Sequence, residues 1–324
     1  MTTFLKFIAG LLLLAMLAAL ASYIFVKMSA KQLDDQARAN APGNFISLSN
    51  GQIHYRWRGP ETGPIIIMSH GFSTPNFIFE QNAKALADEG FRVLTYDHFG
   101  RGWSDRPKAK YDVDFYDKEL LELADGLDII APFGLVGLSM GGPITAEFTA
   151  RHPDRVSKLF LFVPAGFVLG TDEGSTNDKL LRTPIIGDFV WRVFGKSLLL
   201  GDPQYDESQI ASANRLAGDV SEQMQYAGYF EALLSSYRHL PMRDRDETYA
   251  RAHATGTPIH AVFGEADQTV LIESADRLAS AAPSATITRL GNGEHGLNYQ
   301  MNTDTNALLL TFFGDTNIEG PAEN

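Results

Sequence analysis

The chain has 324 residues, and none of them is cysteine. This absence excludes disulfide bonds and cysteine-ligated zinc sites, but it does not reveal the compartment, because exported proteins can also lack disulfides. No internal repeat is present, and no histidine cluster has the spacing of a zinc site, so the sequence predicts neither a metal nor a cofactor. Basic residues are few: 27 Lys and Arg stand against 39 Asp and Glu, and the net charge of −12 disfavours nucleic acid as a partner.

The most informative stretch is Leu135–Gly142, which contains a Gly-x-Ser-x-Gly pattern centred on Ser139. Such a pattern arises by chance roughly 0.15 times in a chain of this composition, so its context decides its meaning. A short apolar run predicts a buried strand over Phe133–Leu138, and Pro143–Arg151 has the pattern of an amphipathic helix. Strand, tight turn and helix in this order predict a nucleophile elbow that projects the Ser139 hydroxyl from the end of a sheet.

A second apolar run, about seventy residues before the elbow, ends in His70-Gly71-Phe72. Acyl transfer places negative charge on the former carbonyl oxygen, and each backbone N–H aimed at that oxygen is worth about 10²–10³ in rate. We expect the amides of Phe72 and Met140 to be these donors. His70 is expected to brace the loop by hydrogen bonding rather than to act as the general base.

Two later loops supply candidates for an acid and a base. A proline-led apolar strand is followed by Asp267, and an alternating strand over Ala285–Leu290 is followed by a glycine-rich loop that holds His295. The chain order is Ser139, Asp267, His295, as in one of the known arrangements of a serine triad. In such a triad His295 takes the serine proton, Asp267 fixes the imidazole tautomer, and the reaction passes through an acyl-enzyme.

Other histidines and acids compete for these roles. Glu294 adjoins the candidate base, but residues adjacent in the chain rarely face each other well enough to act as acid and base. His98 and His152 lie in loops away from the expected position of the base. Surface or packing roles are expected for His54, His239, His253 and His260. Asp267 and His295 are therefore the favoured pair.

Strand-like and helix-like segments alternate along most of the chain. The strand-like runs start near Pro64, Phe91, Phe133, Val156, Pro258 and Ala285. This alternation predicts an α/β fold with a mostly parallel central sheet and helices on both faces. About ninety residues between Val163 and Pro258 do not show this alternation of strand-like and helix-like segments, which predicts an inserted helical cap. Its apolar segments, Ile185–Phe194 and Leu198–Leu200, suit an acyl chain above Ser139 as well as ordinary packing within the cap.

Phe7–Val26 is a stretch of twenty residues without a charge, long enough to cross the roughly 30 Å core of a bilayer as a helix. A cleaved signal peptide is the alternative, because Ala19-Leu20-Ala21 offers a cleavage site, but the apolar run continues past it and favours an uncleaved anchor. Positive residues after the span would keep the following domain in the cytoplasm, whereas a lone signal-anchor exports it. We expect an exported domain on a bacterial inner membrane.

These features divide the chain into six segments. They are a transmembrane anchor (1–28), a linker (29–43), the first part of the catalytic core (44–163), the cap (164–251), the second part of the core (252–316) and a polar tail (317–324). The core and the cap together have a size that is normal for one catalytic domain with an insertion.

The elbow, the His-Gly turn and the order of the triad resemble the α/β-hydrolase superfamily over residues 44–314. The segment Tyr96–Pro107 is similar to the Asp-x-x-Gly-x-Gly-x-Ser loop of that superfamily, and the resemblance implies a structural role for Asp97 and Arg101. The overall plan is similar to that of membrane-anchored monoacylglycerol lipases and esterases, which implies hydrolysis of carboxylic esters. The Ser-Met-Gly-Gly elbow also resembles that of meta-cleavage-product hydrolases, which break carbon–carbon bonds. Ser139 argues against haloalkane dehalogenases and epoxide hydrolases, which carry aspartate there.

Three classes of function follow. The leading one is a membrane-anchored serine hydrolase whose partners are a small-molecule or lipid ester and, through the N-terminal helix, a membrane. A carbon–carbon hydrolase or an amidase with the same triad is the alternative. A non-catalytic binding protein on the same scaffold is disfavoured, because the chain keeps a candidate for each triad position.

Overall fold

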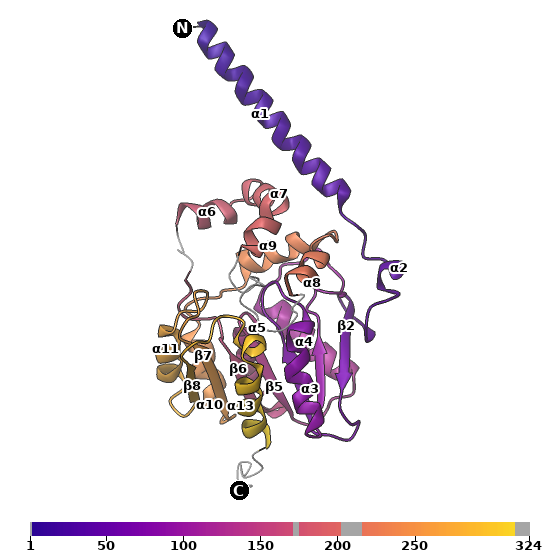
Figure 1. Ribbon diagram of the computed structural model, residues 1–324, viewed down its shortest axis with the longest axis vertical. Coiled ribbons are helices and arrows are strands. Elements are labelled where there is room, and N and C mark those ends of the chain that lie inside the picture. The colour runs from indigo at the N-terminus through magenta and orange to yellow at the C-terminus, as the bar shows by residue number, and fades with distance from the viewer. Residues whose placement is uncertain (1, 171–174, 202–215, 315–324) are drawn as a thin grey trace.

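The computed structural model describes residues 2–170, 175–201 and 216–314, and the polar tail expected at 317–324 lies outside these ranges. Its centre is one sheet in the order β1-β2-β4-β3-β5-β6-β7-β8 (Figure 1). The strands are β1 Asn44–Leu48, β2 Gly51–Arg58, β3 Ile65–Ser69, β4 Arg92–Tyr96, β5 Phe133–Leu138, β6 Val156–Phe162, β7 Ile259–Gly264 and β8 Thr286–Leu290. Strands β3 to β8 run parallel to one another, and β1 and β2 form an antiparallel hairpin beside β4. The predicted α/β fold with a mostly parallel sheet is confirmed.

The inner strands form where the sequence has continuous apolar runs. Every residue of β5 and of β7 is buried, as expected for parallel strands that are covered by helices on both sides. The hairpin strands β1 and β2 lie at the edge, where several of their residues are exposed or only half-buried. The sequence predicts the other six strands but not these two, which have no continuous apolar run.

Helices cover both faces of the sheet (Figure 1). On one face lie α4 Val113–Gly126, α5 Gly141–Arg151, α10 Asp246–Ala254 and α11 Glu273–Ala281, and on the other lie α3 Glu80–Asp88, α12 Leu297–Gln300 and α13 Asn302–Gly314. Each face encloses its own apolar core, with Leu120 and Phe148 in the first and Leu86 and Phe313 in the second. Short helical turns occur at α2 Asp35–Arg38, η1 Asn76–Phe79 and η2 Pro153–Arg155.

A group of helices interrupts the alternation between β6 and β7. In the described residues these are α6 Thr176–Arg182, α7 Ile186–Leu200, α8 Leu216–Gln223 and α9 Tyr229–His239, which we call the insertion helices. Helices α6, α8 and α9 each contact α7. All four lie beyond the end of the sheet at which β5 passes into α5 (Figure 1). This is the edge to which the sequence assigns Ser139.

The N-terminal helix α1 Thr2–Ser29 extends from the molecule on the side of the insertion helices (Figure 1). Within the described ranges it is the one helix that is long and apolar enough to cross a membrane, over Thr3–Ser29. At 1.5 Å per residue this segment is about 40 Å long. Length and composition are equally compatible with an anchor and with an N-terminal signal sequence.

Candidate active site

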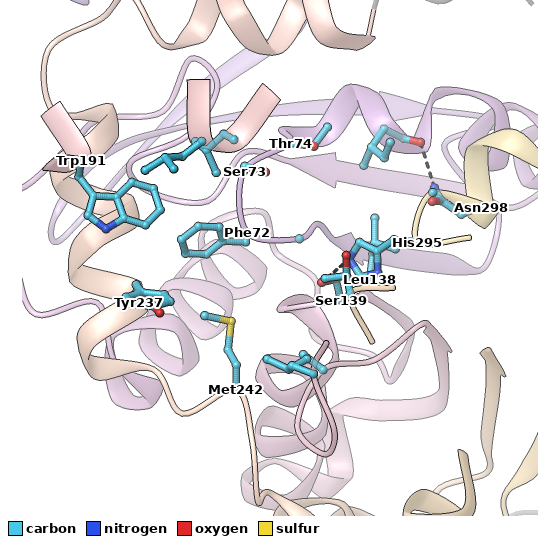
Figure 2. Close-up of a pocket in the computed structure, with 18 residues that line it drawn as sticks. Phe72, Ser73, Thr74, Leu138, Ser139, Trp191, Tyr237, Met242, His295 and Asn298 are labelled. Atoms are coloured by element: carbon cyan, nitrogen blue, oxygen red, sulfur yellow. Dashed lines mark hydrogen bonds between the residues drawn. The ribbon is translucent and has the colours of Figure 1, made fainter. Parts of the chain in front are cut away.

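The three residues predicted to form a triad meet at one edge of the sheet. His295 Nε2 lies 3.0 Å from Ser139 Oγ, and His295 Nδ1 lies 2.9 Å from Asp267 Oδ2; Figure 2 shows the serine and the histidine in contact. Ser139 follows β5 directly, Asp267 follows β7 by three residues, and His295 follows β8 by five. The three residues meet because the carboxyl ends of parallel strands lie at the same edge of a sheet.

The backbone at Ser139 has the strained geometry of a nucleophile elbow. Its φ of 51° lies in the left-handed region, which residues other than glycine rarely adopt. The Ser139 carbonyl accepts a hydrogen bond from the amide of Gly142 at 2.8 Å, which closes the turn. The flanking glycines leave no room for side chains: a Cβ at Gly137 would lie 2.6 Å from the Gly141 carbonyl oxygen, and a Cβ at Gly141 would lie 2.2 Å from that of Ser69.

The carboxylate of Asp267 is buried and fully hydrogen-bonded. Oδ1 accepts the amides of Thr269 (2.7 Å) and Val270 (2.9 Å), and Oδ2 faces His295 Nδ1. Because a carboxylate only accepts hydrogen bonds, we assign the imidazole proton to Nδ1. Nε2 of His295 is then left to accept a hydrogen bond from the Ser139 hydroxyl.

The amides predicted as oxyanion donors border the same space. Gly71 lies against the serine, since a Cβ at Gly71 would be 3.4 Å from Ser139 Cβ and 3.9 Å from its Oγ. Met140 directly precedes α5, where the positive end of the helix dipole favours negative charge. Neither Phe72 nor Met140 donates its amide hydrogen to a group of the described chain. Both amides can therefore serve an oxygen of a bound molecule.

His70 braces the loop of Gly71 and Phe72, as the sequence predicts. His70 Nδ1 donates to the Gly71 carbonyl (2.8 Å), and Nε2 accepts the amide of His98 (3.0 Å). Burial lowers the pKa of His70 well below its ordinary value, so the ring is neutral. Both ring nitrogens are occupied, which leaves His70 unable to act as a base for Ser139.

The other candidates for acid and base have partners elsewhere. His98 is buried, with Nε2 2.9 Å from Ser69 Oγ and Nδ1 hydrogen-bonded to Glu119. Burial lowers the pKa of His98 to about 3 and raises that of Glu119 to about 8, so this pair carries no net charge at neutral pH. Glu294, the alternative acid, has its Oε2 3.5 Å from Gln300 Nε2.

The loop after β4 has the structural role that the resemblance implies. Asp97 Oδ2 lies 2.7 Å from His54 Nδ1 on β2, and Oδ1 accepts the amide of Asn76 (2.8 Å) at the start of η1. Burial alone would raise the pKa of Asp97, but the charge and hydrogen bond of His54 hold it at about 2. Asp97 thus links β2 to the start of η1, which follows the loop of Gly71 and Phe72.

Arg101 joins the loop of Gly71 and Phe72 to two other parts of the fold. Its fully buried side chain donates to the carbonyl of Phe72 (2.9 Å), to the Tyr116 hydroxyl on α4 (2.7 Å) and to Ser236 Oγ on α9 (2.9 Å). The resemblance implies only a structural role for Arg101. Tyr116 and Ser236 are 15 and 135 residues away, and no sequence pattern marks them. Arg101 is therefore a positioning residue that links Phe72 to the insertion helices.

Replacing Arg101 with lysine is expected to lower kcat for ester hydrolysis by about 10- to 100-fold. Lysine lacks the planar fork of arginine and cannot hold Phe72 while it also binds Tyr116 and Ser236, so the oxyanion donor moves. Measuring kcat and the melting temperature on the same samples separates this displacement from unfolding. Arg289→Lys, at an exposed position on β8, is the control and should keep both values. An unchanged kcat in Arg101→Lys would show that other contacts hold Phe72.

A cavity of about 210 Å³ lies beside the Ser139 and His295 side chains (Figure 2). Helix α7 contributes Trp191, Leu198 and Leu199 to its wall, and other residues of the wall are Gly71, Phe72, Leu138, Leu169, Tyr237, Met242 and Asn298. In Figure 2 the side chains of Trp191 and Tyr237 lie at the end of the cavity away from Ser139, and Phe72 lies between them and the serine. Helix α7 thus borders the cavity that holds Ser139, and the cavity can receive an apolar group.

Known proteins share this architecture. Residues 64–300 match the family model of the alpha/beta hydrolase fold. A provisionally named non-heme chloroperoxidase of Synechocystis sp. is 29% identical over 280 residues, which cover 80% of this chain and 94% of that protein. Monoacylglycerol lipase ABHD6 of Homo sapiens is 23% identical over 279 residues, which cover 83% of this chain and 81% of the lipase. The crystal structure of the enol-lactonase of Burkholderia xenovorans has a TM-score of 0.69 at 22% identity and covers 84% of this chain and 100% of the lactonase. With the family model matched over most of its length, this chain belongs to the α/β-hydrolase family.

Proposed function

We propose that the chain is a serine hydrolase that cleaves carboxylic esters through a triad of Ser139, His295 and Asp267. The observation that carries this proposal is the unbroken line of contacts from Asp267 Oδ2 through both ring nitrogens of His295 to Ser139 Oγ, at 2.9 and 3.0 Å. In this arrangement the histidine can remove the serine proton, and the carboxylate stabilises the imidazolium that forms. Membership of a hydrolase family supports the same reaction class.

In this mechanism Ser139 Oγ attacks the acyl carbon of the ester while its proton passes to His295 Nε2. The former carbonyl oxygen becomes an oxyanion, which the amides of Phe72 and Met140 stabilise by hydrogen bonding. The C–O bond then breaks, and His295 gives its proton to the departing alcohol. Water attacks the acyl-enzyme and loses a proton to His295, and Ser139 regains its proton as the carboxylic acid leaves.

We infer that the acyl group is a medium or long hydrocarbon chain, as in a monoacylglycerol-like lipid ester. The cavity next to Ser139 has a mainly apolar wall that includes Phe72 and Trp191. Burial of each methylene group in such a site is worth about 0.8 kcal/mol. A carbon–carbon hydrolase or an amidase is the alternative, because the same triad and elbow serve those reactions.

The proposal also makes α1 an uncleaved membrane anchor. Most of its apolar span over Thr3–Ser29 is exposed, and Tyr23 in the later part of the helix contacts Arg192 of α7. Removal of α1 as a signal peptide would abolish this contact. A signal-anchor orientation places the catalytic domain on the exported side of a bacterial inner membrane.

Initial rates on p-nitrophenyl esters from acetate to palmitate, measured with the full chain in detergent micelles, test this function. We expect kcat/KM to rise by about tenfold or more from acetate to octanoate, since two buried methylene groups suffice for about tenfold. Ser139→Ala provides the background rate. A serine-dependent preference for acetate would contradict the lipid substrate. Serine-dependent cleavage of amides or carbon–carbon bonds, with no esterase activity, would favour the alternative.

A further inference from the structure

The later part of α1 packs against α7, one of the insertion helices. The guanidinium of Arg192 on α7 lies 5.0 Å from the centre of the Tyr23 ring on α1. The half-buried residues of α1 are Ala19, Ser22, Tyr23 and Val26, whereas its other described side chains are exposed. Because these four positions are three or four residues apart, they form one face of the helix. Helix α1 contacts α7, and Tyr23 on this face lies against Arg192.

The chain that follows α1 is fastened to the same part of the fold. The amide of Lys31 donates to the Gln225 carbonyl (2.8 Å), and the Lys31 carbonyl accepts the amide of Ala227 (2.9 Å). Both partners lie in the connection between α8 and α9. Two backbone hydrogen bonds therefore hold the end of α1 beside the insertion helices.

The contact of Tyr23 with α7, and the half-buried face that begins at Ala19, lie within the apolar span of α1. Tyr23 precedes the last residue of α1, Ser29, by six positions and Ala19 precedes it by ten. At 1.5 Å per residue these positions lie about 9 and about 15 Å from the helix end along its axis. The hydrocarbon core of a bilayer is about 30 Å thick. A bilayer that surrounds α1 therefore also reaches α7.

The charged side chains of α7 are confined to one stripe. Asp188, Arg192 and Lys196 recur every four residues and so lie on one side of the helix. Asp188 pairs with Arg238 at 2.9 Å, and Arg192 pairs with Glu231, both on α9. Lys196 has a long side chain that can extend its ammonium group toward lipid headgroups.

Another face of α7 has no charge, and it is exposed at Ile186 and Phe194 and half-buried at Val190. It carries Ile186, Val190 and Phe194, of which Ile186 is 46% exposed and Phe194 is 51% exposed. Ile185, directly before the helix, is 84% exposed. Outside α1, the strongly exposed large apolar residues of the described chain are Leu180, Ile185, Ile186, Phe194, Leu198 and Ile130. All but Ile130 belong to α6, α7 or their connection, and such a patch marks an interaction surface.

We propose that Ile185, Ile186, Val190 and Phe194 lie in the headgroup and upper acyl region of the bilayer that holds α1. This inference rests on the assignment of α1 as an anchor in the proposed function. A lipid environment is favoured over a protein partner because α7 packs directly beside the membrane-spanning length of α1 and its exposed face is apolar. Amphipathic helices at membrane surfaces bury such faces at the same depth.

Leu198 connects this face of α7 with the candidate active site. It is 50% exposed, and it also lines the cavity beside Ser139. The Leu198 side chain therefore lies between the exposed face of α7 and the cavity. A lipid ester in this leaflet can pass along α7 to Ser139 without crossing bulk water, which makes the bilayer itself the source of substrate.

Fluorescence quenching by lipids tests this position, and the absence of native cysteine allows single labels. Phe194→Cys carries an environment-sensitive fluorophore, and the full chain is reconstituted in phosphatidylglycerol–phosphatidylcholine vesicles with or without acyl-chain quenchers. Leu13→Cys, in α1, carries the same fluorophore and reports whether α1 lies in the bilayer. Ile130→Cys is the matched control, because Ile130 is apolar and 79% exposed but precedes β5 at the opposite end of the sheet. We expect the quenchers to remove most of the fluorescence at Phe194→Cys and Leu13→Cys and none at Ile130→Cys.

The possible outcomes separate this inference from the proposed function. Quenching at Leu13→Cys but not at Phe194→Cys would overturn the inference and keep the anchor. No quenching at either position would overturn the anchor. A blue-shifted signal at Phe194→Cys that lipid quenchers do not reach would assign the face to a protein partner or a second copy, and would also overturn the inference. Serine-dependent hydrolysis of a soluble acetate ester by the same vesicles reports the hydrolase activity independently.

A kinetic comparison tests the substrate route. The double variant Ile186→Ser/Phe194→Ser is expected to hydrolyse a long-chain ester embedded in vesicles about tenfold more slowly, because burial of these two side chains no longer holds α7 in the bilayer. Its rate on a soluble acetate ester should stay within roughly twofold, since neither residue lines the cavity. An unchanged rate on the embedded ester would overturn the route along α7.

Discussion

Replacing Ser139 with alanine is expected to lower kcat for ester hydrolysis by on the order of 10⁴-fold or more, because the nucleophile that forms the acyl-enzyme is removed. The fold should not change, since alanine and serine place the same Cβ at the left-handed φ of 51°. Initial rates on p-nitrophenyl octanoate measure the loss of activity. Thermal melting followed by circular dichroism measures the stability of the same sample.

Ser280→Ala is the matched control for this experiment. The Ser280 hydroxyl donates only to the Asp276 carbonyl in its own helix (2.9 Å), far along the chain from the elbow, so full activity is expected. A fluorophosphonate probe gives a second readout, because it reacts with an activated serine: it should label the native chain and Ser280→Ala but not Ser139→Ala. If Ser139→Ala keeps most of its activity, another residue is the nucleophile.

The second large effect is expected for Asp267→Asn, which should lower kcat by about 10⁴-fold. The amides of Thr269 and Val270 already donate to Oδ1, so an asparagine must keep its oxygen there and turn its NH₂ group toward His295 Nδ1. Two donors cannot face each other, and the imidazole therefore shifts its proton to Nε2. In that tautomer His295 can no longer accept the Ser139 proton.

Asp244→Asn, at an exposed aspartate paired with Arg277, is the control and should keep its activity. The double variant Ser139→Ala/Asp267→Asn should be no slower than Ser139→Ala alone, because the members of a triad act as one unit. Near-normal kcat in Asp267→Asn would mean that Glu294 or another acid orients His295.

The elbow can be predicted from the sequence because its determinants are local. Gly137 and Gly141 flank Ser139 within five residues, and the apolar strand and the helix on either side are readable from their periodicity. The hydrogen bond that closes the turn joins residues three apart. Asp267 and His295 are predictable for a related reason: each follows a recognisable strand, and parallel strands bring their carboxyl ends together.

Contacts between distant segments have no such signal. Arg101 and Ser236 meet across 135 residues of sequence, and their contact depends on how α9 lies over the loop after β4. The hairpin strands β1 and β2 are likewise recognised only by their pairing with each other and with β4, since polar residues interrupt their apolar ones.

The sequence by itself determined the parallel sheet, the strained turn at Ser139, the order of the candidate triad and the apolar character of α1 and α7. Each of these depends on residue type and short-range spacing, which set backbone conformation and the periodicity of burial. Only the tertiary structure decided that Arg101 braces Phe72 against α9 and that α7 lies between α1 and the Ser139 cavity. These contacts join elements far apart in the chain, and their geometry is set by side-chain packing, which leaves no regular pattern in the sequence.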